Sequence, residues 1–312
     1  MVYWGILSLK AEKGEDAMNP EKPNYRPEIV LGCVTVLSAI LLAIMIALSL
    51  PYIDLPRRVP APTKATEVTT VPEETTLETT EETMAPTIPP DPNPYDRADF
   101  QYNYNNYLLL EHGESYPGID VSAFQGKIDW EQVRRSGIRF AMIRLGYRGY
   151  GQKGTLVEDE FVDANLKGAK EAGLFIGAYF FSQATTIEEV DEEIEFFMEI
   201  LGDTQLTMPI VFDWEYISET ARTANVDART LTDMTLHFCR EMEKRGLQPM
   251  VYFNWHQANT LMYLSELEDY PFWLALYSDR MNYPFKIEMW QYTASGKVPG
   301  IPGDVDINVY IP

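Results

Sequence analysis

Residues 174–214, LFIGAYFFSQATTIEEVDEEIEFFMEILGDTQLTMPIVFDW, decide the fold class. The uninterrupted apolar run at 174–181 has the length of a fully buried strand. Segment 186–202 repeats apolar residues at helical spacing, and a second apolar run follows at 208–214. Strands buried on both faces and joined by a helix are typical of a parallel sheet covered by helices. This stretch therefore predicts a strand, a crossover helix and a neighbouring parallel strand.

The same alternation extends over residues 116–312. Eight short apolar segments read as strands: YPGIDV, RFAMIRLGY, LFIGAYFF, MPIVFDW, QPMVYFN, FWLALY, EMWQY and DVDINVY. The helical segments between the early ones are DWEQVRRSG, DEFVDANLKGAKEAG, TIEEVDEEIEFFMEILG and DARTLTDMTLHFCREMEKRG. Gly137, Gly173 and Gly246 close three of them, where a helix C-terminus favours glycine. We expect a compact α/β barrel of the TIM-like (β/α) type, whose last three strands have lost most of their helices.

Carboxyl side chains gather at the expected strand ends, where chemistry sits in such barrels. Asp120 closes the first strand, Asp213 and Glu215 close the fourth, and Asp306 lies in the last. Alternation along a strand points Asp213 and Glu215 to the same side, roughly 6–7 Å apart. Burial of two such close carboxyls raises one pKa, and glycoside hydrolysis requires one protonated and one ionised carboxyl. Taken alone, the D-x-E pattern is weak evidence, and a solvated strand face or a structural ion pair explains it more often than catalysis does.

Aromatic residues cluster at or just past the same strand ends. Flat rings bind the apolar faces of sugars, and the polar tips of Tyr and Trp bind hydroxyls. A single ring is more often part of a core, but their repetition over five or more strand ends favours a glycan site. The predicted substrate-binding residues are Tyr147, Tyr179, Tyr252, Trp273, Tyr277, Trp290 and Gln291.

Several motifs follow one another in order across residues 116–312. They are GIDVSAFQGKIDW, IRLGY, NLKGAKEAGLFIGAYFFS, PIVFDWE, FWLALY and WQYTASGKVPGIPGDVDIN. Together they make this segment similar to the glycoside hydrolase family 25 lysozymes of the Chalaropsis type. The resemblance implies a modified (β/α)5(β)3 barrel. It also implies cleavage of the β-1,4 bond between N-acetylmuramic acid and N-acetylglucosamine in peptidoglycan.

The resemblance also implies roles for single residues. Glu215 matches the family's general acid, and Asp213 matches the partner that orients the substrate's own N-acetyl group as an internal nucleophile, which retains the configuration. Asp120 and Asp306 match two further active-site acids. Phe180 departs from the pattern, because many members have His after the Tyr of this strand; we expect that change to alter a subsite.

A 22-residue run without charge at residues 29–50, IVLGCVTVLSAILLAIMIALSL, is long enough to span a bilayer as a helix. A cleaved signal peptide is the alternative, but the run exceeds the usual apolar region of roughly 7–15 residues and no clear A-x-A site follows. Four Lys or Arg residues precede the run and three follow it by residue 64, which favours a cytoplasmic N-terminus. Residues 1–28 are then a short cytoplasmic tail.

The region 51–115 is predicted to be an extracellular stalk and linker. Between residues 60 and 95, 24 of the 36 residues are Thr, Glu or Pro, a composition that stays extended because it has little to bury. Residues 96–115, rich in Tyr and Asn, form a transition with the composition to pack onto the following domain. The predicted location is the cytoplasmic membrane of a Gram-positive, thick-walled bacterium, single-pass, with the domain outside and glycan strands of peptidoglycan as the partner.

Composition excludes several other classes. Asp and Glu total 47 against 25 Lys and Arg, a net charge of −22, whereas nucleic acids and anionic lipids are bound by clustered basic residues. The two cysteines and three histidines lack metal-site or disulfide spacing, so no metal, cofactor or nucleic acid is expected, and no protein partner is readable. Two other functions remain: a non-catalytic glycan-binding module and a chitinase-like hydrolase.

Overall fold

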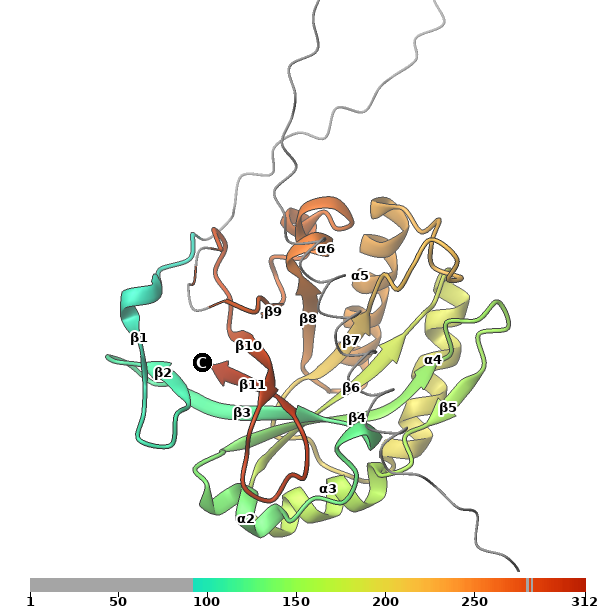
Figure 1. Cartoon of the computed structure of the whole chain (residues 1–312). Helices are drawn as coiled ribbons and strands as arrows, with labels where there is room; N and C mark the ends of the chain where they lie inside the picture. The colour runs from blue at the N-terminus through green and yellow to red at the C-terminus, as the bar shows by residue number, and fades with distance from the viewer. Residues whose placement is uncertain (1–91, 279–280, 282) are drawn as a thin grey trace, which may run out of the picture. The chain divides into compact units, whose positions relative to one another are not determined.

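A nine-stranded sheet curls into a closed barrel in the computed structural model, which describes residues 92–278, 281 and 283–312 (Figure 1). In ring order its strands are β3 (Tyr116–Val121), β4 (Phe140–Arg148), β6 (Phe175–Ser182), β7 (Ile210–Trp214), β8 (Pro249–Asn254), β9 (Phe272–Ala275), β10 (Met289–Gly296) and β11 (Val305–Tyr310). The ring closes where β11 pairs with β3. The ninth strand, β5 (Leu156–Glu158), is added antiparallel at the end of β4. The predicted α/β barrel is confirmed.

The barrel strands are parallel with one exception. From β3 through β10 each pairs in parallel with its ring neighbour, whereas β11 is antiparallel to both β10 and β3. Register places Asp306, near the start of β11, directly opposite Asp120, near the end of β3. The closing strand therefore contributes its N-terminal end to the rim where the other strands contribute their C-terminal ends.

Helices cover the outside of the early strands, as the sequence indicated. They are α2 (Trp130–Arg135), α3 (Val162–Glu171), α4 (Ile187–Leu201) and α5 (Ala228–Lys244), with a short α6 (Trp255–Thr260) after β8. Three 3-10 turns complete the elements: η1 (Arg97–Asp99), η2 (Ala123–Gln125) and η3 (Leu264–Glu266). Within the described residues that follow β9, the chain forms no α-helix, which agrees with the expected loss of helices from the last three strands.

The helix boundaries follow from local chemistry. The side chain of Asp227 caps α5 by accepting a hydrogen bond from the Thr230 amide at 2.7 Å, which satisfies one of the unpaired donors at a helix start. Gly137, Gly173 and Gly246 follow the ends of α2, α3 and α5 with φ of 103°, 74° and 75°. This left-handed conformation is costly for other residues, so the three predicted stop signals are confirmed.

The inside of the barrel is a packed core. Ten buried side chains fill it, among them Phe140, Met142, Val211, Met250 and Met289. A Cβ at Gly118 would lie 2.2 Å from the Phe140 ring, so the glycine of the GIDV motif makes room for this ring. A larger apolar layer lies between the sheet and its helices. Asp120 and Asp306 lie at the rim where the parallel strands end.

Three features were not predicted as regular elements. An antiparallel hairpin, β1 (Phe100–Tyr102) with β2 (Leu108–Leu110), precedes the barrel. Strand β5, which lies beside α4 (Figure 1), and helix α6 are the others. The hairpin falls within the range 51–115 assigned to stalk and linker, so the folded part begins upstream of Tyr116.

The N-terminal predictions lie outside the described residues: the tail 1–28, the span 29–50 and most of the stalk. In the part of the chain that is described, none of the helices combines the length and the apolar character that crossing a membrane requires.

Candidate active site

The carboxyls named from the sequence meet in one cavity at the C-terminal end of the parallel strands. Its volume is about 780 Å³, and Asp120, Asp213, Glu215 and Asp306 all line it. Five of the six predicted sugar-binding aromatics and the predicted amide also line it: Tyr147, Tyr179, Tyr252, Trp273, Tyr277 and Gln291. Ten of the eleven side chains named from the sequence therefore lie in one place, which is where a barrel of this type carries its chemistry.

Asp120 is held by two amide side chains. Its Oδ2 accepts hydrogen bonds of 2.8 Å from Gln291 Nε2 and from Asn308 Nδ2. Asn308 in turn accepts a hydrogen bond from Trp273 Nε1, and Gln291 accepts one from the Tyr277 hydroxyl, both at 2.9 Å. Burial raises the pKa of Asp120, while the two amide donors lower it. The two chains of hydrogen bonds fix the position of this carboxyl.

Asp306 carries the proton of the Asp120–Asp306 pair. Burial and the neighbouring charge of Asp120 raise the pKa of Asp306 to about 8. The hydrogen bond between the two carboxyls raises the pKa of Asp306 and lowers that of Asp120, so Asp306 donates and Asp120 accepts. Two carboxyls facing each other across an antiparallel pair cannot both ionise at low cost.

Asp213 and Glu215 are also shifted toward their protonated forms. Burial raises the pKa of Asp213 well above its usual range, and the charges of Glu215 and Asp120 raise it further. Its Oδ1 is buried and has no hydrogen-bond partner in the part of the chain that the structure describes. Burial raises the pKa of Glu215 too, but the Tyr252 hydroxyl donates to Glu215 Oε1 at 3.0 Å and opposes that rise. Both carboxyls are therefore shifted toward the protonated form by burial.

The position of Glu215 depends on two buried glutamines that the sequence analysis did not single out. Gln183 Nε2 donates to the Glu215 carbonyl oxygen at 2.7 Å, and Gln257 Nε2 donates to the Trp214 carbonyl. Arg222 Nη1 donates to the Gln183 carbonyl at 2.6 Å. These bonds satisfy backbone carbonyl groups near the end of β7. Without the bonds, these buried polar atoms would be unpaired.

One cation reaches the cavity from β4. Both Arg144 Nε and Nη2 lie 2.8 Å from Asp159 Oδ2, in an almost fully buried ion pair. The Arg144 guanidinium also lies 5.2 Å from the ring centres of both Phe124 and Tyr147, a geometry that favours a cation. Its charge lowers the pKa of Asp213 against the larger effect of burial. Asp159 and Phe124 also line the cavity.

Two sequence expectations are wrong about which way a side chain points. Trp290 is fully buried outside the barrel, where its ring packs edge-on against Phe100 at 5.3 Å and its Nε1 donates to the Leu276 carbonyl at 2.9 Å. Phe180 is 1% exposed and packs against Phe197 of α4, so the departure from His does not alter a subsite. Both residues neighbour a cavity residue on the same strand, and alternation turns them to the outside of the barrel.

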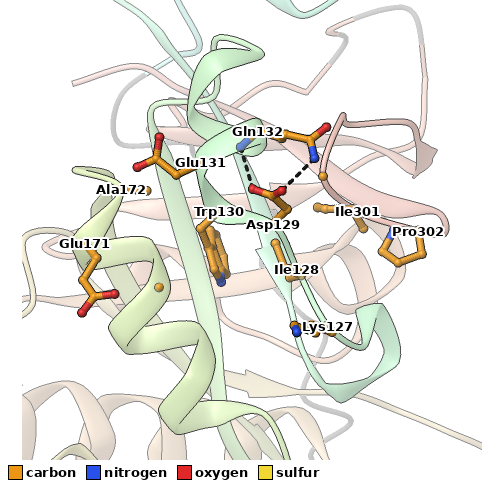
Figure 2. A pocket seen from close by; sticks show the side chains of 12 residues that line it. Lys127, Ile128, Asp129, Trp130, Glu131, Gln132, Glu171, Ala172, Ile301 and Pro302 are labelled. Carbon is orange, nitrogen blue, oxygen red and sulfur yellow. Dashed lines mark hydrogen bonds between the residues drawn. The ribbon is translucent and has the colours of Figure 1, made fainter. Parts of the chain in front are cut away.

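A second hollow, of about 690 Å³, lies on the outside, between α2, α3 and the loop that joins β10 to β11 (Figure 2). Figure 2 shows Asp129 facing Gln132, and its two carboxylate oxygens accept hydrogen bonds from the Gln132 amide (3.0 Å) and Nε2 (2.7 Å). None of the four candidate acids lines this hollow. Among the described residues, no group of three or more His, Cys, Asp or Glu side chains is arranged to hold a metal ion.

Comparison with known proteins identifies the family. Residues 119–301 match the family described as glycosyl hydrolases family 25. The chain belongs to this family. The prediction of a glycoside hydrolase of the lysozyme family is thereby confirmed, since the matched segment carries three of the four candidate acids and ends five residues before the fourth.

Relatives of this family 25 hydrolase include enzymes named for lysozyme activity. Lysozyme M1 of Streptomyces globisporus is 28% identical over 203 residues, which cover 62% of this chain and 67% of that protein. The uncharacterized protein YegX of Escherichia coli is 30% identical over 203 residues, or 62% of this chain and 68% of its own length.

A solved structure shares both fold and sequence. The modular autolysin LytC from Streptococcus pneumoniae, in complex with a synthetic peptidoglycan ligand, aligns with a TM-score of 0.57 at 25% identity. The alignment covers 68% of this chain and 50% of that one. This family 25 hydrolase therefore spans about half the length of that autolysin.

Proposed function

We propose that this family 25 hydrolase is a membrane-tethered lysozyme. Its substrate is the peptidoglycan glycan strand, and it cleaves the β-1,4 bond between N-acetylmuramic acid and N-acetylglucosamine. The observation that carries the proposal is the cavity in which Glu215, with a raised pKa, lies with Asp213, Asp120 and Asp306. The peptidoglycan ligand bound by the related autolysin and the activity named for Lysozyme M1 support the choice of substrate.

Glu215 acts as the general acid. Burial raises its pKa and so favours the protonated carboxyl, and that proton passes to the glycosidic oxygen as the C1–O bond breaks. The Tyr252 hydroxyl limits the rise by stabilising the ionised form. It also stabilises the carboxylate that remains after proton transfer, so the acid can give up its proton without leaving a buried charge unpaired.

Asp213 serves the substrate's own acetamido group. Its Oδ1 is a buried acceptor without a partner among the described residues, and an acetamido N–H is a donor that fits it. That hydrogen bond turns the acetamido carbonyl oxygen toward C1, where it forms the new bond as the leaving oxygen departs. Water then opens the resulting oxazolinium ring while Glu215 takes back a proton, and the configuration at C1 is retained.

The test is to identify the new chain ends on peptidoglycan. Full-length protein in mild detergent is incubated with peptidoglycan, and the products are reduced with borohydride and analysed by mass spectrometry. New muramitol ends are expected, and Glu215→Gln should reduce their rate by about 10²–10⁴-fold, the range for a general acid. Glu219→Gln is the matched control, since Glu219 is exposed and does not line the cavity.

The other outcomes point to other functions. Glucosaminitol ends would mean cleavage of the other glycosidic bond. Faster cleavage of chitin than of peptidoglycan would mean a chitinase-like hydrolase. Binding without any new ends would mean a non-catalytic glycan-binding module.

The tether is proposed from the uncharged run at residues 29–50, which is long enough to span a membrane. Carbonate washing of membranes should leave the protein in the pellet, and deletion of residues 29–50 should release it. A reagent that cannot cross membranes should label the catalytic domain on wall-stripped intact cells. Extraction of the intact chain by carbonate, or labelling only after lysis, contradicts the tether.

A further inference from the structure

The β1–β2 hairpin, which lies outside the residues that match the family, is fixed against the barrel. Phe100 is 1% exposed and packs edge-on against Trp290. The Leu108 amide donates to the Tyr292 hydroxyl at 3.2 Å, and the buried Tyr107 shares a hydrogen bond of 2.8 Å with Ser136. Because these contacts reach β10 and the end of α2, the hairpin is a rigid addition to the wall of the barrel.

The hairpin borders a hollow of about 530 Å³ next to the active-site cavity. Tyr102, Asn105 and Asn106 form its hairpin side, and residues of β10, β11 and the segment after β9 form the other. Tyr277 lines both the hollow and the active-site cavity. Its hydroxyl bonds to Gln291 inside the cavity at 2.9 Å, while 60% of the residue is exposed. The two spaces therefore meet at this ring.

The lining of the hollow has the chemistry that sugar rings require. Tyr102 is 49% exposed and stands edge-on to Tyr292, with ring centres 6.5 Å apart. Amides come from Asn105 and Asn106, and hydroxyls from Thr293 and Ser295. The one Lys, Lys297, is paired with Asp304 at 2.6 Å. Exposed rings among neutral donors and acceptors suit uncharged hydroxyls and acetamido groups more than a phosphate or an apolar helix.

We propose that this hollow binds further sugar units of the same glycan strand whose cleaved bond lies in the active-site cavity. The proposal rests on the proposed function, because it takes the glycan strand as the substrate. The strand continues past Tyr277 onto the hairpin, and Tyr102 stacks against a sugar ring there. The hairpin thus makes the enzyme favour long strands over short fragments.

The test compares peptide-free glycan fragments of two lengths. The full-length protein, in mild detergent, is given a tetrasaccharide and an octasaccharide of alternating N-acetylglucosamine and N-acetylmuramic acid. Tyr102→Ala should lower kcat/KM on the octasaccharide by about three- to tenfold, the loss expected for part of a buried ring face, with little change on the tetrasaccharide. Tyr102→Phe keeps the ring and should retain most of the preference for the octasaccharide.

Tyr104→Ala is the matched control, since Tyr104 is 95% exposed at the hairpin turn and does not line the hollow. Equal losses on both substrates, or none on either, overturn the proposal. If the wild-type protein cleaves neither fragment, the result contradicts the proposed function and does not test the hollow. Octasaccharide binding then decides the question: weaker binding by Tyr102→Ala supports the hollow, and equal binding overturns it.

Discussion

Tyr252→Phe removes one hydroxyl from the candidate active site and keeps the rest of the side chain. The hydroxyl donates to Glu215 Oε1 at 3.0 Å. The ring is 7% exposed and packs edge-on against Trp273 with centres 5.1 Å apart, contacts that phenylalanine retains. The substitution therefore changes the hydrogen bonding of the proposed acid and leaves the packing of the barrel in place.

The size of the effect follows from the two forms of Glu215. A hydrogen bond to an ionised group contributes about 1.5–3 kcal/mol, and one to a neutral group about 0.5–1.5 kcal/mol. The difference, roughly 1–1.5 kcal/mol, favours the carboxylate and corresponds to about one pKa unit. Removing the donor should raise the pKa of Glu215 by that amount, because the Tyr252 hydroxyl lowers it in the native protein.

The assay is the dependence of kcat/KM on pH with soluble glycan. A general acid must be protonated, so the alkaline limb of the profile reports its pKa in the free enzyme. The limb should move to higher pH by about one unit in Tyr252→Phe. Tyr283→Phe is the control: it removes a buried hydroxyl that has no hydrogen-bond partner within the described residues and does not line the cavity, so the limb should stay in place. An unmoved limb, or one shifted to lower pH, refutes the assignment of Glu215 as the acid.

Two further predictions concern stability and packing. Burial raises the pKa of Glu193 to about 7 despite its ion pair with Arg148. The native state therefore binds this proton more tightly than the unfolded state. The stabilisation that the proton provides falls by about 3 kcal/mol as pH rises from about 4.5 to about 7. Glu193→Gln should remove that part of the pH dependence in urea unfolding; parallel curves for the two proteins would contradict it. Trp290→Phe should lower the free energy of unfolding by about 1–3 kcal/mol through lost packing and a lost hydrogen bond, with KM for glycan within about twofold of wild type. A raised KM with unchanged stability would contradict this and would mean that Trp290 binds the substrate.

The sequence predicted the elements whose signal is local and strong. The apolar run that became β6 and the amphipathic stretch that became α4 differ clearly in period, and Gly202 ends α4 with φ of 51°. Strand β5 and the β1–β2 hairpin have three residues per strand, too few to show a period. The direction of β11 also could not be read, because the alternation of a strand is the same in both directions.

The part of the candidate site that was predictable is the part that depends on strand ends and on charged residues. Asp213 lies in β7 and Glu215 comes directly after its last residue, so their common side followed from spacing alone. The same rule would have excluded Trp290, because its neighbour Gln291 faces the cavity. Asn308 could not be found in this way: its role comes from Asp120 on a strand 188 residues earlier, and only the closure of the barrel brings the two together.

The antiparallel direction of β11 also determines where the chain leaves the barrel. Asp306 pairs with Asp120 at the catalytic rim, and four residues later Tyr310 pairs with Tyr116 at the other rim, about 13 Å away at roughly 3.3 Å per residue. Pro312 is exposed beyond it. A fluorescent protein or an affinity tag joined after Pro312 would therefore sit behind the enzyme, and a bead that holds the tag would leave the mouth of the cavity facing the wall material.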